Sequence, residues 1–537
     1  MLKLTASFAS LLLATRLAAA QSVIAHYMAQ QLYSYEDQHI TADIQQAQAL
    51  GIEAFVLNIA KMDYEVEKIQ NVVYPAAERL GFKLLYSIDT GYDWTTGDIV
   101  TLVSATAKSN ATYLWDGKPL LSSFSPSRDG YGDSFWADVK SGLKSGGVDV
   151  VLAPALIHVG AEQLKSEWQS PDGFMNWWAW PSDTADNLTT TQDLDYQAVV
   201  AERTGPYMMG VSPWQFKNLA GQAWIQNSDY LYKYRWEQAI NEVKPDIVEL
   251  ITWNDYGESH YMIDINPIVG LDPDSTKYIN GVDHTAWQVM TKYYISWFKA
   301  CLGSSAAKKR SLPRDGPPTR ITRPEYRDLR PNPARFDGAC STVTVTVTAG
   351  GESNTSTPAS TPSSSETPAS TDAPASTETP APTETPSSTV SSSSPPETTP
   401  TQAPSTGGSC TAPAFDKDVL VWYFRIYPKD IVCTPGGTVP RNQDLVSDQI
   451  FAWAGLSAPA TVRIDAGNVT GSYELDAGAH IVAIPFPTTD ETPYFQIIRD
   501  GAPVVSGHAT ATILHSNCTY YDMNARVGQL DSVEASA

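Results

Sequence analysis

The chain has 537 residues, with 59 acidic against 36 basic side chains and a formal net charge of −23 at pH 7. Because nucleic acids and anionic membrane surfaces repel such an excess of negative charge, we expect neither as a partner. The length favours at least two folded units, and the 15 Trp and 26 Tyr residues supply flat rings that either fill cores or stack on sugar faces.

The N-terminus has the pattern of a secretory signal peptide. Lys3 gives a positive start, residues 9–13 are apolar, and Ala18-Ala19-Ala20 forms a small-residue cleavage site before Gln21. The apolar run is too short to span a bilayer, no later stretch is long enough, and the end of the chain has no hydrophobic tail for a lipid anchor. We therefore predict that residues 1–20 are removed and that the protein is secreted, without a membrane partner.

The five cysteines all lie late in the chain, at positions 301, 340, 410, 433 and 518. In an oxidising compartment some should pair, but the number is odd and several pairings are open, including Cys433 with Cys518 or with Cys410. None has metal-ligand spacing with a histidine, so we expect no metal and no cofactor. Glycosylation sequons, which suit a secreted protein, begin at Asn110, Asn187, Asn354, Asn468 and Asn517.

Residues 21–302 alternate short apolar runs with amphipathic, helix-like segments. The eight runs are 23–28, 54–60, 83–89, 120–125, 150–156, 174–180, 206–213 and 247–255. The first two helix-like segments end in Leu50-Gly51 and Leu80-Gly81 and lead straight into a buried run, as in successive βα units. The pattern predicts an α/β fold, a (β/α)8 TIM barrel closed by a helix over 284–300. An open doubly wound sheet is the alternative, but no glycine-rich phosphate turn follows the first run.

The rest of the chain changes character twice. Residues 303–340 form an Arg/Pro-rich connector, in which the basic run 308–310 is either a processing site or, as we favour, a solvated linker. Residues 341–409 are almost entirely Ser, Thr, Pro, Ala and Glu, which predicts a disordered, O-glycosylated spacer. Residues 410–530 contain five strand-like runs and a hairpin signal at Asp500-Gly501, which predict a small β-sandwich accessory domain.

Carboxylates stand where catalytic groups lie in a (β/α)8 barrel, at the C-terminal ends of the strands. The third run ends at Asp89, and the eighth leads into a loop that contains Asp255 and Glu258. Paired carboxylates without a metal cluster or a nucleophile elbow indicate acid/base cleavage of a glycosidic bond, with one carboxyl protonated and the other ionised. The structural alternatives are a helix cap for Asp255, a surface position for Glu258 and a strand-end cap for Asp89.

Several other polar and aromatic residues near the strand ends are candidates for sugar binding. A lone histidine is more often structural, and only one or two of the tryptophans should form sugar platforms while the others pack. Trp253 and Tyr256 also suit an apolar wall that keeps one carboxyl protonated. The substrate-binding candidates are His26, Asn58, Trp178, Trp180, Trp214, Trp253, Asn254, Tyr256 and His260.

The string Ile251-Thr-Trp-Asn-Asp-Tyr-Gly-Glu-Ser-His260 resembles glycoside hydrolase family 71, the fungal α-1,3-glucanases or mutanases, and so do segments 25–28, 51–58, 81–89, 116–119 and 211–214. The resemblance implies endo-hydrolysis of α-1,3-glucan with inversion, a glucan endo-1,3-α-glucosidase activity. It also implies that Asp255 and Glu258 are catalytic and that Asp89 assists. We prefer Glu258 as acid and Asp255 as base, with the swapped roles open. An inverting pair is expected to lie about 6.5–9.5 Å apart.

The C-terminal segment resembles the β-rich region that accompanies this family, through residues 421–425 and 427–429. Because a long Ser/Thr/Pro tract precedes it, the segment either packs on the barrel or acts as a tethered glucan-binding module. We expect a monomer that acts on α-1,3-glucan. The alternatives are a glycosidase for another neutral glucan and a non-catalytic glucan-binding wall glycoprotein, which would not need both acids.

Overall fold

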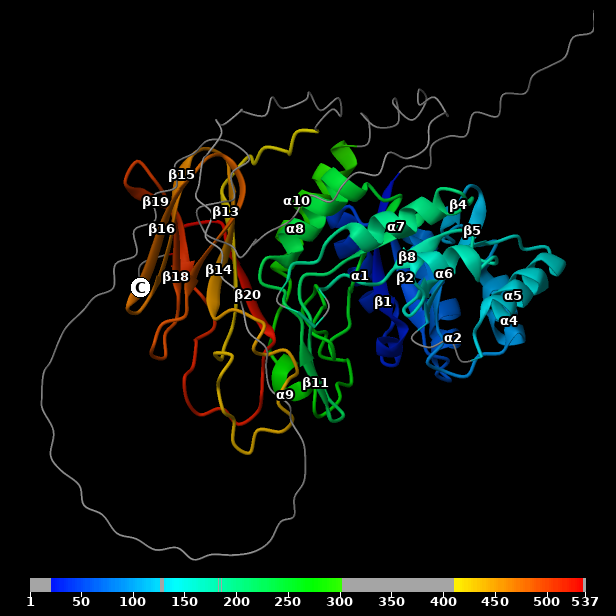
Figure 1. The fold of residues 1–537 in the computed structure, drawn as a ribbon, viewed down its shortest axis with the longest axis horizontal. Helices are drawn as coiled ribbons and strands as arrows, with labels where there is room; N and C mark the ends of the chain where they lie inside the picture. The colour runs from blue at the N-terminus through cyan, green and yellow to red at the C-terminus, as the bar shows by residue number, and fades with distance from the viewer. Residues whose placement is uncertain (1–20, 126–129, 182, 185, 302–409, 535–537) are drawn as a thin grey trace, which may run out of the picture. The chain divides into compact units, whose positions relative to one another are not determined.

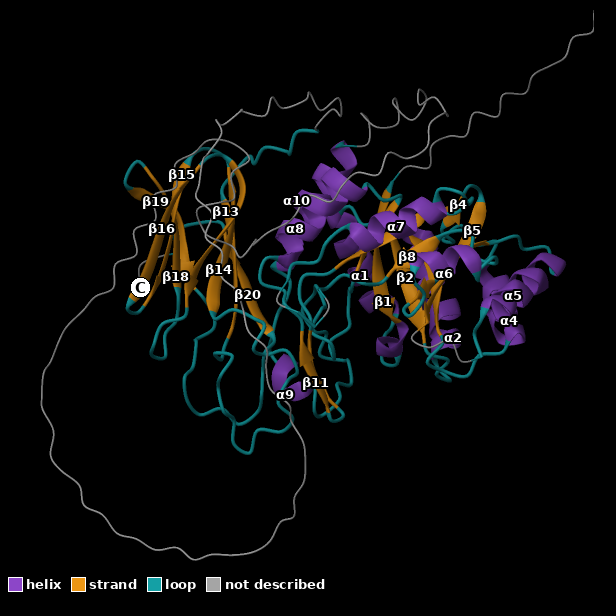
Figure 2. Ribbon diagram, viewed as in Figure 1, coloured by secondary structure: helices purple, strands orange, loops and turns teal. Residues whose placement is uncertain are grey.

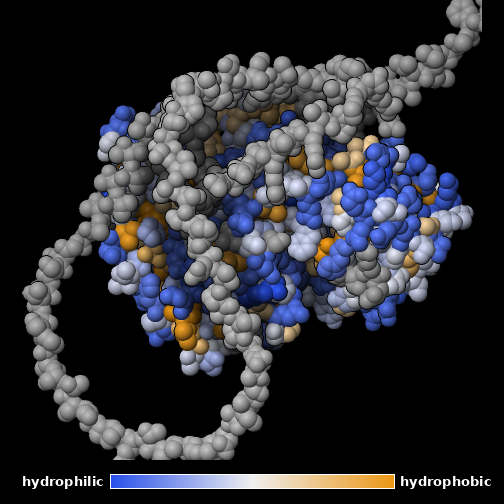
Figure 3. Space-filling view, viewed as in Figure 1, coloured by the Kyte–Doolittle hydropathy of each residue, from blue (hydrophilic) through white to orange (hydrophobic). Residues whose placement is uncertain are grey.

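The computed structural model describes residues 21–125, 130–181, 183–184, 186–301 and 410–534. The predicted signal peptide, the Arg/Pro connector, the Ser/Thr/Pro tract and Cys340 lie outside these residues. None of the described helices is long and apolar enough to cross a membrane. On the face drawn in Figure 3 the described surface is mainly hydrophilic, with hydrophobic residues in small patches.

A curled, mostly parallel sheet forms the centre of residues 21–301. Its strands run in the order β4-β5-β3-β2-β1-β12-β9-β8, with β6 and β7 also paired to β5. All of these pairs are parallel except the short β4 against β5. The strands are β1 (Ser22–Met28), β2 (Ala54–Ile59), β3 (Lys83–Asp89), β4 (Leu114–Trp115), β5 (Lys118–Ser125), β6 (Val151–Leu152), β7 (Ala155–Leu156), β8 (Phe174–Asn176), β9 (Tyr207–Val211) and β12 (Ile247–Leu250).

Helices alternate with these strands along the chain (Figures 1 and 2). As predicted, α1 and α3 end at Gly51 (φ 92°) and Gly81 (φ 67°), whose left-handed backbone a glycine adopts without strain. The helices are η1 (Ala29–Leu32), α1 (Asp37–Leu50), α2 (Glu65–Lys68), η2 (Ile69–Val73), α3 (Tyr74–Leu80), α4 (Thr96–Thr106), α5 (Asp133–Ser145), α6 (Ala161–Ser166), α7 (Thr191–Val200), α8 (Leu231–Glu237), η3 (Gln238–Val243), α9 (Thr276–Ile279) and α10 (Trp287–Ala300).

Two further features complete this part of the chain. Backbone hydrogen bonds run from Gly173 N to Leu152 O (3.0 Å) and from Met175 N to Pro154 O (3.1 Å), so the segment that leads into β8 lies beside the segment of β6 and β7. A small antiparallel hairpin, β10 (Phe216–Leu219) and β11 (Gln222–Ile225), follows β9. Helices alternate with the strands of the main sheet, and the sheet is curled and buried on both faces. For this reason every residue of β2 is buried.

Residues 410–534 contain two four-stranded antiparallel sheets, ordered β17-β14-β13-β20 and β16-β15-β18-β19. The hairpin predicted at Asp500-Gly501 joins β18 to β19, and both turn residues have positive φ. The five predicted runs lie in β13, β14, β15, β17 and β18. The strands are β13 (Val419–Arg425), β14 (Gln449–Leu456), β15 (Ala460–Ala466), β16 (Val469–Leu475), β17 (Gly478–Pro485), β18 (Tyr494–Arg499), β19 (Ala502–His508) and β20 (Ala525–Leu530).

Both faces of β13 are buried, and each face belongs to a different core. Leu420 and Trp422 join the apolar cluster between the two antiparallel sheets, whereas Val421 and Tyr423 join the large cluster that contains α10. This alternation follows from the two-residue period of a strand. On the second face, Tyr423 packs on Trp287 with ring centroids 4.9 Å apart. The first sheet therefore packs on α10, the first of the two arrangements that the sequence left open.

Two disulfides fix the C-terminal segment. Cys433 pairs with Cys518, one of the two pairings considered from sequence. The alternative, Cys410 with Cys433, is wrong, because Cys410 pairs with Cys301 at the end of α10, with a Cα–Cα distance of 5.2 Å. The Cys301–Cys410 bond therefore joins the two ends of a 109-residue interval that contains the whole connector and tract.

We predict that Cys301→Ser with Cys410→Ser lowers the free energy of unfolding by about 4–5 kcal/mol, because the unfolded chain gains the entropy of an open loop. Replacing residues 303–408 with a short Gly/Ser connection should return about 2 kcal/mol to that double variant, since closing a short loop costs less entropy. Chemical denaturation of the four combinations measures both effects. The same shortening with the disulfide intact is the control and should change stability little; a large change there would contradict this account.

Candidate active site

Polar side chains from distant parts of the chain meet at one edge of the parallel sheet. The neighbouring strands β3, β2, β1 and β12 run in the same direction, so their C-terminal ends share this edge. Asn58 and Asp89 lie at or near the ends of β2 and β3, and the loop 251–262 follows β12. The order β3-β2-β1-β12 places Asp89 three strands away from that loop.

The loop after β12 folds back on itself through backbone hydrogen bonds. Thr252 N donates to His260 O (2.8 Å) and Met262 N donates to Trp253 O (3.1 Å). Inside this turn the N–H of Glu258 donates to Asp255 Oδ1 (3.1 Å). Asp255 thus also stabilises this turn, but the next described helix, α9, begins only at Thr276. The turn gathers residues 255, 258 and 260 at one point.

Three titratable side chains form a compact cluster at this turn. His260 Nε2 lies 3.3 Å from Glu258 Oε2 and 4.0 Å from Asp255 Oδ2. One possible metal-ligand atom from each residue, a ring nitrogen or a carboxylate oxygen, lies within 4.8 Å of the other two. The Lys217 ammonium, 3.2 Å from Glu258 Oε1, already balances negative charge here. The cluster therefore suits acid/base chemistry better than it suits a divalent cation, which Lys217 would repel.

The surroundings of Glu258 favour its ionised form. Burial alone would raise the pKa of this carboxyl, but His260 and Lys217 outweigh burial and lower the pKa to about 2. Gln215 Nε2 donates a further hydrogen bond to Oε2 (3.0 Å). Three side chains therefore hold Glu258 as an anion in a fixed orientation.

Asp255 has the opposite bias. Burial raises the pKa of its carboxyl, His260 opposes the rise, and the negative charge of Glu258 adds to it. The two carboxyls are thus driven apart, with Asp255 the more readily protonated one. This difference in pKa favours Asp255 as the acid and Glu258 as the base, the assignment that the sequence left open as the alternative. One oxygen of each carboxyl lies within 4.8 Å of the other, which is shorter than the separation expected for an inverting pair.

Asp89, at the end of β3, and His26, within β1, lie on the other side of the carboxyl-bearing turn along the sheet. Burial raises the pKa of Asp89, while a hydrogen bond from Gly91 N (2.9 Å) and the nearby His26 oppose the rise. His26 Nδ1 lies 2.7 Å from Glu249 Oε1, and both side chains are almost fully buried. His26 Nε2 has no hydrogen-bond partner among the described residues. The edge therefore carries a third carboxyl and a buried His–Glu pair beside it.

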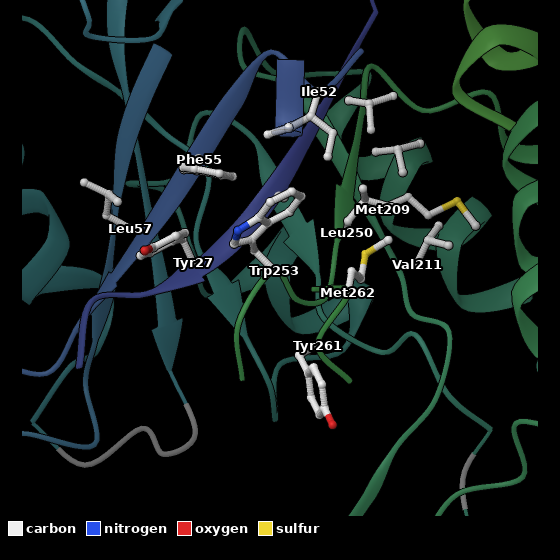
Figure 4. Close-up of a cluster of buried hydrophobic side chains, with 14 of the residues drawn as sticks. Tyr27, Ile52, Phe55, Leu57, Met209, Val211, Leu250, Trp253, Tyr261 and Met262 are labelled. Carbon is white, nitrogen blue, oxygen red and sulfur yellow. The ribbon is translucent and has the colours of Figure 1, made fainter. Parts of the chain in front are cut away.

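The structure places some of the predicted sugar-binding residues away from any surface. Trp253 is fully buried and packs on Phe55 with ring centroids 5.3 Å apart; Figure 4 shows its indole among core side chains. Tyr256 is 1% exposed and also belongs to the core. Trp214 is equally buried and donates from Nε1 to Met523 O (3.2 Å). These three aromatic side chains pack in the interior beneath the site, and a contact between them and a sugar stays a prediction.

The remaining candidates divide in the same way. Asn254 is fully buried, and its side-chain oxygen accepts the N–H of Met28 (2.7 Å), so it joins the loop to the end of β1. Trp180 is nearly buried and packs against His260 with ring centroids 5.3 Å apart. Trp178 is half-buried, and Asn58 accepts a hydrogen bond from Gln30 (2.8 Å). Of the tryptophan candidates, only Trp178 keeps more than a trace of exposed surface.

Sequence reasoning missed Gln215, Lys217 and Glu249. The first two come from the chain around β10, and nothing in a single sequence shows that this hairpin reaches Glu258. Glu249 did leave a signal, because it is an acidic residue inside the otherwise apolar run Ile247–Leu250. A buried charge in a strand requires a partner, and His26 on the adjacent strand supplies it.

Comparison with known proteins gives a consistent set of relatives. The sequence profile described as Glycosyl hydrolase family 71 matches residues 19–312 and 406–537. The chain is 35% identical over 298 residues to the glucan endo-1,3-alpha-glucosidase agn1 of Schizosaccharomyces pombe, covering 54% of this chain and 69% of that protein. It is 25% identical over 527 residues to the mutanase Pc12g07500 of Penicillium rubens, covering 96% and 90%. It is also 26% identical over 293 residues to the ascus wall endo-1,3-alpha-glucanase of S. pombe, covering 52% and 66%.

We predict that Lys217→Met lowers the free energy of unfolding by about 1–2 kcal/mol at pH 7, because it leaves a partly buried carboxylate without its cation. The folded-state pKa of Glu258 lies below its unfolded value of 4.5, at about 2. The stabilisation is therefore present above about pH 4.5 and is lost as the pH falls towards 2. Denaturation curves between pH 7 and 2 should show the variant converging on the wild type.

Lys233→Met is a matched control, since Lys233 and its partner Glu237 are 20% and 30% exposed, close to the 18% and 28% of Lys217 and Glu258. The change in the free energy of unfolding of Lys233→Met measures the effect of removing a lysine of equal exposure elsewhere in the chain. If Lys217→Met destabilised the protein equally at every pH, Lys217 would act by packing and the charge account would fail.

Proposed function

The chain belongs to glycosyl hydrolase family 71, and on that basis we propose that it hydrolyses the α-1,3-glucosidic bonds of α-1,3-glucan within the polymer. The names of its relatives, a glucan endo-1,3-alpha-glucosidase, a mutanase and an ascus wall endo-1,3-alpha-glucanase, support this substrate. The observation that carries the proposal is the turn after β12, where two adjacent carboxyls have pKa values displaced in opposite directions. Glycoside cleavage requires this division of labour, and a net charge of −23 suits a neutral polymer.

In the proposed reaction Asp255 is the acid and Glu258 is the base. Protonated Asp255 gives its proton to the glycosidic oxygen as the bond from that oxygen to the anomeric carbon breaks. Ionised Glu258 takes a proton from water, and the water oxygen bonds to the anomeric carbon. The cycle leaves Asp255 ionised and Glu258 protonated, and exchange of one proton through solvent restores both. His260 and Lys217 keep Glu258 anionic between cycles.

The two carboxyls lie close together, but their surroundings hold them with different firmness. Glu258 has three side-chain partners, Gln215, Lys217 and His260, whereas the side chain of Asp255 accepts a hydrogen bond from one backbone N–H. We propose that Glu258 stays fixed and that Asp255 rotates to reach the glycosidic oxygen, which widens the pair towards the inverting range. Asp89, three strands away, positions the sugar from the other side of the edge.

We also propose the finer architecture and the location. Hydrogen bonds between the β6/β7 segment and β8 support a closed (β/α)8 catalytic barrel over residues 21–302, followed by the connector 303–340, the spacer 341–409 and a β-sandwich unit over 410–530. The signal-peptide pattern and the two disulfides support secretion, since disulfides persist in oxidising compartments. A wall polysaccharide as substrate requires the same location.

We predict that Asp255→Asn and Glu258→Gln each reduce the release of reducing sugar from α-1,3-glucan by at least about a hundredfold, because each removes one half of the proton transfer. Asp264→Asn is the control and should keep full activity, because it removes an exposed carboxylate just beyond the same turn. Parallel assays on α-1,4- and β-1,3-glucan test the substrate. Full activity in either active-site variant would remove the assignment, and binding without hydrolysis by the wild type would favour a binding protein.

We predict that the first reducing ends released from α-1,3-glucan are β-anomers, because an inverting mechanism turns the α bond over in one displacement. Proton NMR during the first minutes of reaction distinguishes the two anomers before they equilibrate. Initial α-anomers would contradict the proposed water attack. They would instead assign Glu258, which is already close to Asp255, as a nucleophile in a retaining mechanism.

A further inference from the structure

Exposed tyrosines gather on the loops that follow β1, β2 and β3. Tyr33 is 70% exposed, Tyr92 is 40% exposed, and Tyr64 is half-buried. Three of the six exposed large hydrophobic side chains in the described part of 21–301 lie on these loops, and a fourth, Val66, lies in α2 directly after the second loop. The six are Tyr33, Met62, Val66, Tyr92, Leu114 and Leu194. Scattered exposed apolar residues need no explanation, but a group on adjacent loops indicates a binding surface.

The three tyrosines lie at the same edge of the sheet as the carboxyls. Tyr33 and Tyr64 meet edge to face, with ring centroids 5.1 Å apart. Tyr92 follows Asp89 within one turn, and its N–H donates to Asp89 O (3.3 Å). Because β3, β2, β1 and β12 are successive parallel strands of one sheet, the tyrosines occupy the Asp89 side of the edge and Glu258 occupies the other side.

Internal contacts hold two of these loops in place. The Glu65 carboxylate accepts the N–H groups of Ala60 and Met62, the latter at 2.7 Å, and so fixes the loop that presents Tyr64. Tyr64 itself donates to Gln30 O (2.7 Å). On the third loop, Tyr131 donates to Tyr92 O (2.7 Å). Rings on fixed loops lose little conformational entropy when a ligand binds.

A polar group beside the tyrosines also lacks a partner. Gln30 donates from Nε2 to Asn58 Oδ1 (2.8 Å), but its own Oε1 is buried without a hydrogen-bond partner among the described residues. A sugar hydroxyl is a suitable donor for such an amide oxygen. Rings for the sugar face and an unmatched acceptor for its hydroxyl thus lie together.

We propose that Tyr33, Tyr64 and Tyr92 form a platform that binds the neutral α-1,3-glucan chain on the Asp89 side of the bond that is cleaved. This inference rests on the proposed function and extends it to substrate length. Phenol rings stack on the apolar faces of sugars without needing charge, which fits a strongly acidic protein and an uncharged polymer. The platform acts on long chains, since three strand positions separate the loop after β3, which carries Tyr92, from the loop after β12, which carries Asp255.

Replacing the exposed rings tests the platform. Tyr33→Ala and Tyr92→Ala should each raise KM for α-1,3-glucan about threefold to tenfold, the loss expected for one aromatic stacking contact, while kcat and the hydrolysis of short oligosaccharides stay unchanged. Tyr33→Phe and Tyr92→Phe keep the ring and should behave as the wild type. Leu194→Ala, which truncates an exposed side chain on α7, is the control and should have no effect.

Two results would overturn the platform while leaving the proposed function intact. One is an unchanged KM in both alanine variants; the other is an equal loss on short and long substrates. Binding of Asp255→Asn to insoluble α-1,3-glucan tests the platform separately from the proposed hydrolysis. If the wild type hydrolysed no α-1,3-glucan, the proposed function would fail. Even then, the platform would be supported if Asp255→Asn bound one of several glucans and Asp255→Asn combined with Tyr33→Ala lost that binding.

Discussion

The site depends on one turn whose ends are joined by backbone hydrogen bonds. Thr252 and His260 face each other across it, so Asp255, Glu258 and His260 gather in a small volume. Trp253 anchors the turn in the core, and Asn254 ties it to the end of β1. Trp253 and Asn254 thus fix the backbone that presents the carboxyls.

The charge that biases Glu258 comes from a second element, and the C-terminal segment supports that element. Lys217 lies on β10, whose partner strand β11 exchanges backbone hydrogen bonds with Arg441: Ile225 N donates to Arg441 O (3.0 Å) and Arg441 N donates to Ala223 O (2.9 Å). Asn218 also donates to Tyr521 O (3.2 Å). Loops of the C-terminal segment therefore hold the hairpin that carries Lys217, so this segment contacts the surroundings of the site as well as α10.

Local chemistry was readable from the sequence, and pairing across the chain was not. Periodicity and the Leu-Gly endings located α1, α3 and most strands of the main sheet, but not β10, β11, β16 or β20. The strand-end rule singled out Asp89, Asp255 and Glu258. The Cys301–Cys410 bond spans 109 residues, and no local pattern encodes it. The same limit applies to Lys217, since only the folded hairpin brings it to Glu258. An aromatic residue next to a catalytic carboxyl has equal reason to pack or to bind, and burial alone separates Trp253 from Trp178.

The arrangement along the sheet edge reconciles two opposed requirements. A carboxyl that must stay protonated needs little water around it, whereas a polymer needs open rings on which to lie. A single deep pocket could not provide both, because shielding the acid would also exclude the chain. Parallel strands in the order β3-β2-β1-β12 separate the two along one edge, with shielded carboxyls after β12 and exposed rings after β1–β3. In the proposed mechanism, the strand order lets a largely buried acid act on a substrate too long to be buried.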